Sequence, residues 1–292
     1  MSDSSRVALW KKYLRYDPTR WLLETNDPSI LLWYQLDIAH RPEDAPGVIA
    51  ARERVLYSES VQAIFAAQDA WGFWNDAEKL AFPRYTATLW NLALLAELGI
   101  PRASRRARHA CEFILQNFLT AEDTFAGLNE LEAGYLLRAF GYFNYAADPR
   151  TRRVARALSA RAQTLTARLC ALWGCRAFRH DVEIARATQT LSARVLADET
   201  LCDRAAYTFP QFQPRDALFT LRVLAEYECA ADPRVAPLLD ALAAKQNRYA
   251  QWTLEYDLNA QLTTPLENQN APSRWLTLNA LRVLTKIILR AN

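Results

Sequence analysis

Apolar residues recur at the spacing of an α-helix along almost the whole of this 292-residue chain. The segments carry apolar side chains at positions i, i+3, i+4 and i+7, and the sustained apolar–polar alternation of a half-buried strand is absent. Only 7 residues are glycine, and neither glycine-rich nucleotide-binding motif, GxGxxG nor GxxxxGKS/T, occurs. The pattern predicts an all-α protein with helices at 30–39, from Pro46 onward, and at 61–65, 85–98, 105–118, 131–143, 151–173, 182–196, 216–228, 234–245 and 272–289.

The composition excludes several classes of protein. Lys and Arg number 35 against 32 Asp and Glu, and the densest basic run, 102–108, is typical of a solvated helix face, so we expect no nucleic-acid partner. No stretch of about 18 uncharged apolar residues occurs, so we expect no transmembrane segment. The first residues are polar, unlike a signal peptide, and the 5 cysteines are an odd number in a chain with ample core. We therefore expect reduced, mostly buried thiols in a bacterial-type cytoplasm.

One helix-boundary motif occurs twice. Ala-Ala-Asp-Pro-Arg ends at Arg150 and again at Arg234, 84 residues later, each time between two apolar helical segments. In such a motif Asp caps the new helix, Pro occupies its first position, and the small residues let the chain turn. A degenerate copy, Leu-Gly-Ile-Pro-Arg, spans 98–102. The long apolar helices start near 85, 132, 181, 216 and 272, at intervals typical of helical-hairpin repeats that stack into a solenoid or close into a ring.

A second motif occurs in each half of the chain. Gln68 is followed by Gly72 and Trp74 in the pattern Q-x3-G-x-W, and Gln246 is followed by Trp252 at the same spacing, with alanine in place of glycine. A glutamine that ends one helix can bond the loop backbone while the tryptophan ring packs over the joint. The motif resembles the QW motif of squalene and oxidosqualene cyclases and of their protein prenyltransferase relatives.

Three further stretches resemble helix openings of that superfamily: 82–99, which begins Phe-Pro-Arg-Tyr, 209–224, which begins Phe-Pro-Gln-Phe, and 272–284, which begins Pro-Ser-Arg-Trp. Together with stretch 21–29, they make the chain similar to bacterial squalene-cyclase-like proteins of about this length. The resemblance implies an (α/α) toroid, in which inner and outer helices alternate around a central cavity and the inner helices point their N-termini to one end. It assigns 61–292 to the toroid and 1–60, which lacks the repeat markers, to N-terminal helices packed on it.

The acid and metal motifs of these relatives are absent from the sequence. It contains neither the Asp-x-Asp-Asp proton donor of class II cyclases nor the Asp-Asp-x-x-Asp of magnesium-dependent class I enzymes, so standard cyclase chemistry is not expected. The Asp-x-Cys pair of the prenyltransferase zinc site is absent too. Cys170, Cys175 and His180 are spaced to approach one another, but buried thiols and a helix-capping histidine explain them without zinc. We expect no metal and no cofactor.

Charged residues at expected helix starts are the candidates for chemistry. His180 and Asp181 stand at one start and Asp216 at another, and an aspartate beside a histidine can act as an acid–base pair, so these three are the candidate catalytic residues. Glu132 and Arg274 open two further helices and are assigned to ligand binding. The toroid that the resemblance implies would bring all five to one cavity mouth. Helix capping, worth about 0.3–1 kcal/mol per acid, explains the same positions without chemistry.

Aromatic residues supply a candidate lining for a cavity. Tyr85, Trp90, Phe212 and Trp275 lie at or within two turns of expected inner-helix starts, and we assign all four to ligand binding. An aromatic-lined cavity suits an isoprenoid or another elongated apolar ligand. Core packing and the Gln-Trp joints explain most of the chain's aromatic residues equally well. Segment 259–271, rich in Asn, Gln and Thr, is either a lid over the cavity mouth or a surface loop.

Three functions stay open on the sequence. The first is a terpene-cyclase-like toroid that binds an apolar, isoprenoid-like small molecule and transforms it, if at all, without either acid motif. The second is a non-catalytic helical-repeat scaffold that binds a protein or peptide. The third is a lyase or hydrolase that uses the neighbourhood of His180 and Asp181 on a polar substrate, since other (α/α) barrels host such chemistry.

Overall fold

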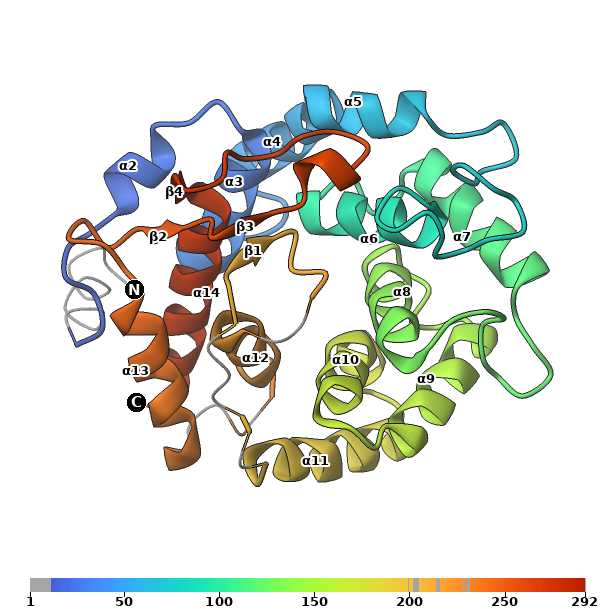
Figure 1. Ribbon diagram of the computed structural model, residues 1–292. Coiled ribbons are helices and arrows are strands. Elements are labelled where there is room, and N and C mark those ends of the chain that lie inside the picture. Colours follow the sequence, from blue (N-terminus) through green and yellow to red (C-terminus); the bar gives the residue numbers. More distant parts are fainter. Residues whose placement is uncertain are drawn as a thin grey trace. The chain divides into compact units, whose positions relative to one another are not determined.

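A computed structural model of the chain shows a mostly helical protein, as predicted (Figure 1). It describes residues 12–291 apart from 199, 202–204, 214, 215, 228, 230 and 231, so Cys202 and the two alanines of the second Ala-Ala-Asp-Pro-Arg copy lie outside the described residues. None of the described helices is long and apolar enough to cross a bilayer. The chain divides into two compact units. Unit 1 comprises the residues up to Val55, Asp198–Leu258 and Leu266–Asn292; unit 2 comprises Leu56–Ala197 and Asn259–Pro265.

Unit 2 consists of helices in two rows. Its elements are α5 (Glu59–Ala66), α6 (Thr88–Leu98), α7 (Arg105–Asn117), α8 (Glu130–Tyr142), α9 (Pro149–Arg161), α10 (Leu165–Cys175), the 3-10 helix η2 (Arg176–Phe178), α11 (Val182–Leu196) and the 3-10 helix η5 (Asn259–Gln261). Helix α8 packs against α6 and α10 in one row, and α11 packs against α9 and α10 (Figure 1). Short turns join α8 to α11 in succession, so neighbours in sequence run antiparallel. Two alternating rows are what an (α/α) architecture requires.

Helices α8 and α10 approach each other through glycine. A Cβ atom at Gly134 would lie 2.4 Å from the carbonyl oxygen of Cys170, and one at Gly174 would lie 2.5 Å from the carbonyl oxygen of Gly134. Further along the pair, a Cβ atom at Gly141 would lie 2.4 Å from the Cβ of Ala177. Because the numbering rises in the same direction on both sides of this contact, α8 and α10 run parallel.

The segment expected to form one helix over 151–173 is two helices. The backbone leaves the helical conformation at Ala162, and Thr164 starts α10 by accepting the Ala167 N–H at its hydroxyl oxygen (3.1 Å). The prediction is wrong because the apolar periodicity runs on through this break. This additional chain reversal shifts the row of the helices that follow it in unit 2. Helix α10 packs on α8. The sequence predicts α11 in the same row as the helix that Glu132 opens, but it packs against α9 and α10.

Other helix boundaries differ from the predictions for local reasons. Tyr85 has a left-handed backbone (φ 66°), which an α-helix does not accommodate, so α6 begins three residues later. The helix expected at 216–228 already ends at Leu224, and that expected at 234–245 opens with a 3-10 turn. The helix expected at 30–39 continues as a π-helix, and the first two residues of 272–289 form a short strand.

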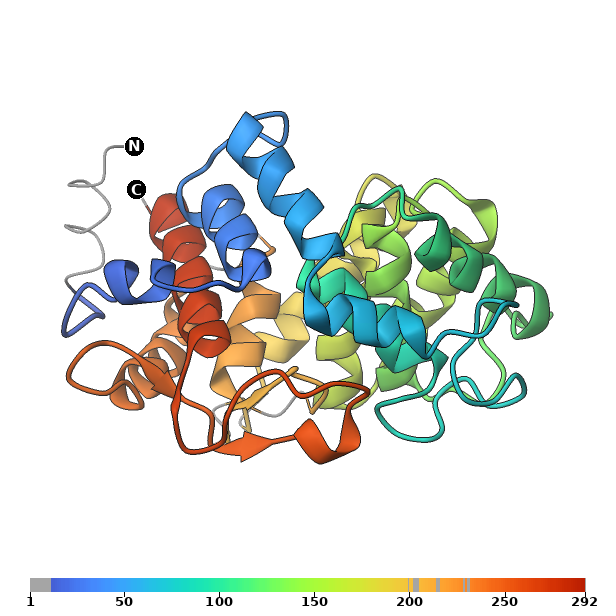
Figure 2. The same ribbon diagram turned by 90° about the horizontal axis from the view of Figure 1, so that it is seen from above.

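Unit 1 is organised around its last helix, α14 (Arg274–Ala291). The other elements are α2 (Thr19–Leu23), α3 (Pro28–Trp33), the π-helix η1 (Tyr34–Ile38), most of α4 (Pro46–Leu56), α12 (Ala217–Leu224), the 3-10 helix η4 (Pro233–Val235), α13 (Ala236–Ala244), β1 (Thr208–Phe209), β2 (Trp252–Thr253), β3 (Tyr256–Asp257) and β4 (Pro272–Ser273). Strand β1 pairs in parallel with β3, and β2 pairs antiparallel with β4. Helix α14 contacts α2, α3, η1 and α12 as well as β1, β2 and β4 (Figure 2).

The two Gln-Trp joints share one geometry. In each, an isolated antiparallel bridge closes a loop between the glutamine and the tryptophan. The indole N–H donates to a carbonyl of the preceding helix, from Trp74 to Ile64 (2.7 Å) and from Trp252 to Leu242 (2.8 Å). The amide of Gln68 donates to a loop carbonyl (3.0 Å), and both indole rings are buried. The bridge and the indole bond therefore recur in both copies. The glutamine amides differ, because that of Gln246 donates to the carbonyls of Tyr13 (2.7 Å) and Ala243 (2.9 Å) and not to its loop.

A third loop of this type contains neither glutamine nor tryptophan and is not predicted from the sequence. A bridge between Leu119 and Phe125 closes it over the same number of residues. All three loops hold a left-handed residue at the fifth position: Gly72 (φ 99°), Asp123 (φ 55°) and Ala250 (φ 55°). Glycine tolerates this conformation best, but aspartate and alanine adopt it here. The bridged loop thus occurs three times in the described chain, whereas the glutamine and tryptophan occur in only two of these loops.

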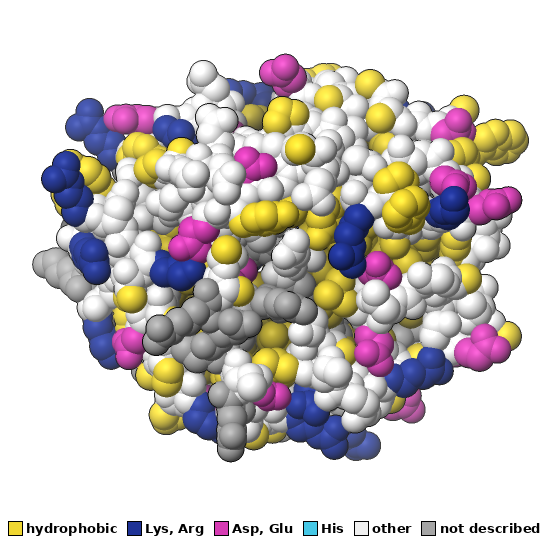
Figure 3. Space-filling view, in the orientation of Figure 1, with side chains coloured by type: hydrophobic (Ala, Val, Ile, Leu, Met, Phe, Trp, Pro, Cys, Tyr) yellow, Lys and Arg dark blue, Asp and Glu magenta, His cyan; other side chains and the backbone are white. Residues whose placement is uncertain are grey.

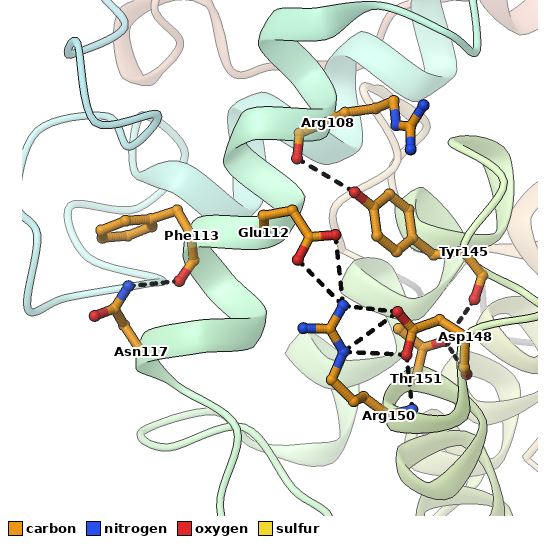
Figure 4. A network of polar contacts seen from close by, with 8 residues as sticks. All are labelled: Arg108, Glu112, Phe113, Asn117, Tyr145, Asp148, Arg150 and Thr151. Carbon is orange, nitrogen blue, oxygen red and sulfur yellow. Dashed lines mark hydrogen bonds and ion pairs between the residues drawn. The ribbon is translucent and has the colours of Figure 1, made fainter.

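The first Ala-Ala-Asp-Pro-Arg copy begins α9 in the predicted way (Figure 4). Asp148 accepts the Arg150 N–H (2.8 Å), and the proline takes the first helical position. The Arg150 guanidinium lies between Asp148 (2.7 Å) and Glu112 (3.1 Å), which ties α7 to α9. In the second copy Asp232 accepts the Arg234 N–H (2.9 Å) and pairs with the same guanidinium (2.7 Å). The predicted capping is confirmed in both copies.

The contact between α8 and α10 predicts a pair of coupled substitutions. We expect Gly141→Ala to lower the free energy of unfolding by about 1–3 kcal/mol, because the new methyl group overlaps that of Ala177. Ala177→Gly in the same chain removes the overlap and restores most of the loss, whereas Gly174→Ala meets the backbone and has no such rescue. Denaturant unfolding of these variants measures the effect. Wild-type stability in the single variant Gly141→Ala would contradict the close approach.

The first Gln-Trp joint predicts a contrast between two tryptophans of one loop. We expect Trp74→Phe to cost about 2 kcal/mol, because it opens a void and leaves the Ile64 carbonyl without the indole N–H. Trp71 is 74% exposed, so Trp71→Phe should change stability by at most about 0.5 kcal/mol. Thermal unfolding of both variants checks the contrast, and equal costs would mean that the indole bond does not fasten the joint.

Candidate functional site

Three aromatic rings meet where α6 and α8 begin in unit 2. Tyr85 packs edge-on against Trp90, with ring centroids 5.0 Å apart, and Trp90 packs against Tyr135 (5.9 Å). All three residues are buried. The Arg84 guanidinium lies over the rings of Tyr85 (5.8 Å) and Trp90 (6.0 Å), although 57% of its side chain is exposed, and lies 4.0 Å from the Glu132 carboxylate. Three predicted ligand-binding residues, Tyr85, Trp90 and Glu132, therefore lie in one neighbourhood.

Polar contacts hold the edges of this aromatic cluster. Glu132 accepts the Asn129 N–H (3.1 Å) and donates its own N–H to the Asn129 side chain (3.0 Å), which forms a capping box at the start of α8. In α6 the buried Asn91 accepts the Thr263 hydroxyl (2.8 Å). The first half of the expected lid or surface loop, 259–265, is thereby bonded to α6. A lid role for that segment stays a prediction.

Asp216 is a buried acid at the start of α12 in unit 1. It is 1% exposed, accepts the Phe219 N–H (2.7 Å) and receives the Gln211 amide at both carboxylate oxygens (3.2 and 3.3 Å). The carbonyl oxygen of Gln211 accepts the Arg222 guanidinium (2.6 Å), so one amide bridges two buried ionisable groups. Burial raises the pKa of Asp216 to about 6, against the lowering effect of these hydrogen bonds. Asp216 is thus a helix cap and also an acid that exchanges a proton near neutral pH.

Two further carboxyl groups of unit 1, those of Asp27 and Glu267, lie outside the predicted site residues. Glu267 accepts the Trp275 backbone N–H (3.2 Å) and the Ser273 hydroxyl, while Asp27 accepts the Trp275 indole N–H. Burial raises the pKa of Glu267 to about 7, and the charge of Asp27 raises it in the same direction. Burial also raises the pKa of Asp27. The Trp275 ring stacks on Phe209, with centroids 4.3 Å apart and planes 10° apart.

The other predicted binding residues of unit 1 have structural contacts. The Arg274 guanidinium lies over the Trp21 ring (4.7 Å) and donates to the Glu24 carbonyl (2.9 Å), which ties α14 to α2. Phe212 is buried, and its N–H donates to the Pro210 carbonyl (2.8 Å) in the turn before α12. Their assignment to ligand binding stays a prediction.

His180 and Asp181 line a surface pocket of unit 2, between the turn that precedes α9 and the turn that precedes α11. Asp181 caps α11 by accepting the N–H groups of Glu183 (3.1 Å) and Ile184 (3.3 Å), and its second oxygen accepts two guanidinium N–H groups of Arg156 (2.6 and 3.1 Å). The Arg156 guanidinium holds the pKa of Asp181 below its usual value. Both carboxylate oxygens are thus engaged, which disfavours Asp181 as the base of an acid–base pair.

The structure separates His180 and Asp181 from Glu132. Because Gly141 faces Ala177, the turn at 176–181 lies at the C-terminal end of α8, whereas Glu132 lies at its start. The 13 residues of α8 span about 20 Å. The expected gathering of these residues at one mouth is therefore wrong within unit 2. Its cause is the unpredicted break before α10, which places Asp181 at the start of a helix that runs the other way.

The cysteines near His180 are buried in α10. Burial raises the pKa of Cys175 to about 12 and raises that of Cys170 as well, so both remain protonated thiols at neutral pH. His180, by contrast, is exposed. Among the described residues, no three His, Cys, Asp or Glu side chains are grouped so that they could hold a metal ion.

Comparisons with known proteins give a likeness to solved structures but none to a family profile. No known protein family profile matches the sequence, and no curated protein matches it significantly. Among solved structures, the chain is similar to a type II terpene cyclase from Scytonema in complex with its substrate, geranylgeranyl dihydroxybenzoate. The two share 14% sequence identity over 90% of this chain and 88% of the cyclase, with a TM-score of 0.46. At this similarity no site residue carries over to this chain.

The raised pKa of Glu267 predicts a pH dependence of stability. The folded state holds this proton more tightly than the unfolded state, whose carboxyl titrates near 4.5, so stability falls as the pH rises from about 4.5 through 7. We expect wild-type protein to lose about 1–3 kcal/mol more than Glu267→Gln between pH 5 and 8. Urea unfolding across this range measures the difference.

The matched control is Glu122→Gln. The pKa of Glu122 lies below its ordinary value, so Glu122 titrates mainly below pH 5 and the variant should follow the wild-type profile closely. If Glu267→Gln followed that profile too, the carboxyl of Glu267 would be ionised throughout the range.

Proposed function

We propose that this protein binds an apolar, isoprenoid-like small molecule whose chain lies against the aromatic cluster of Tyr85, Trp90 and Tyr135. The observation that carries the proposal is the covering of this cluster. The guanidinium of Arg84, whose side chain is 57% exposed, lies over two of its buried rings. A cation on an aromatic face is held by only about 0.5–1 kcal/mol at an exposed site, so an apolar ligand displaces it at low cost.

The chemistry of the cluster suits such a ligand. Phenol and indole rings offer a large contact area to alkyl chains and double bonds, and the edge-on pair of Tyr85 and Trp90 presents both a ring face and a ring edge. Arg84 and Glu132 lie beside the rings and supply a donor and an acceptor for a polar group at one end of the ligand. Apolar pockets with a few placed polar groups are the usual form of small-molecule sites.

A proton-transfer step is a second candidate function, carried by Asp216 of unit 1. A buried carboxylic acid with a pKa of about 6 keeps a proton that an ordinary aspartate has lost at that pH, which is the property of a general acid. The commitment of Asp181 to Arg156 and to α11 does not favour the lyase or hydrolase alternative. Binding of a protein or peptide stays a prediction.

Native mass spectrometry of protein purified gently from its source cells tests the ligand class. A retained apolar molecule of isoprenoid mass supports the proposal. A reproducible protein partner in place of a small molecule would contradict the proposal and favour the helical-repeat scaffold that binds a protein or peptide.

The aromatic cluster predicts a position-specific loss of affinity. We expect Tyr135→Leu to weaken binding of geranylgeraniol about ten-fold, because the change keeps apolar volume but removes one ring from the cluster. Quenching of tryptophan fluorescence on titration measures the dissociation constant. Tyr142→Leu makes the same change at the opposite end of α8 and should leave the affinity unchanged. If both variants bound geranylgeraniol with equal affinity, the aromatic cluster would not be part of the binding site.

A further inference from the structure

The surface pocket of unit 2 that His180 and Asp181 line combines apolar and polar side chains. It encloses about 280 Å³, where the turn at 143–148 meets the turn at 176–181. Its apolar lining comes from Ala146, Ala147, Ala177 and Phe178, and its polar lining from Arg152, His180 and Asp181. The close approach of Ala177 to Gly141 backs one wall with the end of α8, so the pocket cannot deepen on that side.

The polar lining offers hydrogen-bond donors. Both oxygens of Asp181 are taken, by two backbone N–H groups and by Arg156. Arg152 donates to the Ala147 carbonyl (3.1 Å), which leaves most of its five N–H groups available. His180 is exposed and makes no hydrogen bond or ion pair with the part of the chain that the structure describes. A ligand entering here therefore meets a guanidinium and an imidazole without a free acceptor to oppose an anion.

The neighbouring acids are paired with arginines, and each of these arginines is shared by two carboxylates. Glu183 pairs with the guanidinium of Arg156 (3.1 Å), and Asp148 pairs with Arg150 (2.7 Å). Arg179, in the same turn as His180, adds a further positive charge. Within the described part of the chain no carboxylate pairs with Arg152, the one arginine of the pocket lining, and Asp181 in the wall disfavours a dianion. A single negative charge fits best.

We propose that this pocket binds a small carboxylate with an apolar body about the size of one ring, the carboxylate on Arg152 and His180 and the body against Ala146 and Ala177. A guanidinium matches a carboxylate in bidentate geometry. The volume of about 280 Å³ lies just below the roughly 300–1,000 Å³ of pockets for drug-sized ligands, so a ligand with a single small ring suits it. The inference does not depend on the proposed function, because the two sites use different residues at opposite ends of α8.

Isothermal titration calorimetry of the full chain with three probes tests the proposal. Benzoate carries both the charge and the ring, acetate carries only the charge, and benzyl alcohol carries only the ring. We expect benzoate to bind at one site in the low millimolar range, and each of the other two to bind at least ten-fold more weakly. Binding of benzyl alcohol as tight as that of benzoate would show that the Arg152 guanidinium takes no part, and would overturn the proposal.

Three variants locate the binding. Arg152→Gln removes the main cation and Ala147→Leu fills the exposed rim, and each should weaken benzoate at least ten-fold. Arg153→Gln changes the adjacent arginine, which pairs with Asp123 (2.8 Å) outside the pocket lining, and should leave the affinity unchanged. Benzoate affinity that is insensitive to both Arg152→Gln and Ala147→Leu, or no binding at 20 mM, would overturn the proposal. Tyr135→Leu should not change benzoate binding, so failure here is distinct from failure of the proposed function.

Discussion

The backbone contact between α8 and α10 determines the layout of unit 2. Gly134 and Gly174 let the two helices approach until a carbonyl oxygen occupies the space of a missing side chain, and no larger residue fits this register. The two turns that join α8 to α9 and α9 to α10 make α8 and α10 parallel, so their starts lie together and are separated from their ends by the length of α8. The aromatic cluster lies at one end and the His180 pocket at the other. The proposed sites are therefore two separate sites.

Three candidate acids take part in capping helices, and they differ in the group that contacts the carboxylate besides the capped backbone N–H groups. Asp181 receives Arg156, which stabilises its charged form and lowers its pKa. Asp216 is enclosed with only an amide and distant cations, so burial prevails and its pKa rises. Glu132 completes a capping box and lies beside Arg84. Capping determines the position of each acid in the fold, and the other groups around the carboxylate determine whether its pKa rises or falls.

Local signals in the sequence were enough for the helices and for the loops that carry a marker. The Asp-Pro-Arg caps and the Gln-Trp joints are local, and both form as their residues indicate. The break at 162–164 escaped prediction because a single capping threonine, Thr164, competes with apolar periodicity on both sides. The pairing of Asp27 with Glu267 has no local signal at all. Asp27 is an ordinary helix cap and Glu267 stands in a polar loop 240 positions later. Only the packing of α14 against α3 brings both to Trp275, Asp27 to its indole N–H and Glu267 to its backbone N–H.

The connectivity of the two units sets an order for folding during synthesis. Unit 2 is almost one continuous stretch of chain, and its helices contact near neighbours in sequence, so it forms while the C-terminus is still unmade. Unit 1 is assembled from three segments, and the Trp275 ring joins Asp27 to Phe209 across most of the chain. The first segment of unit 1 is therefore synthesised well before α14, the helix that covers its apolar faces. Until α14 is made, those faces lack their native partner and are open to wrong contacts.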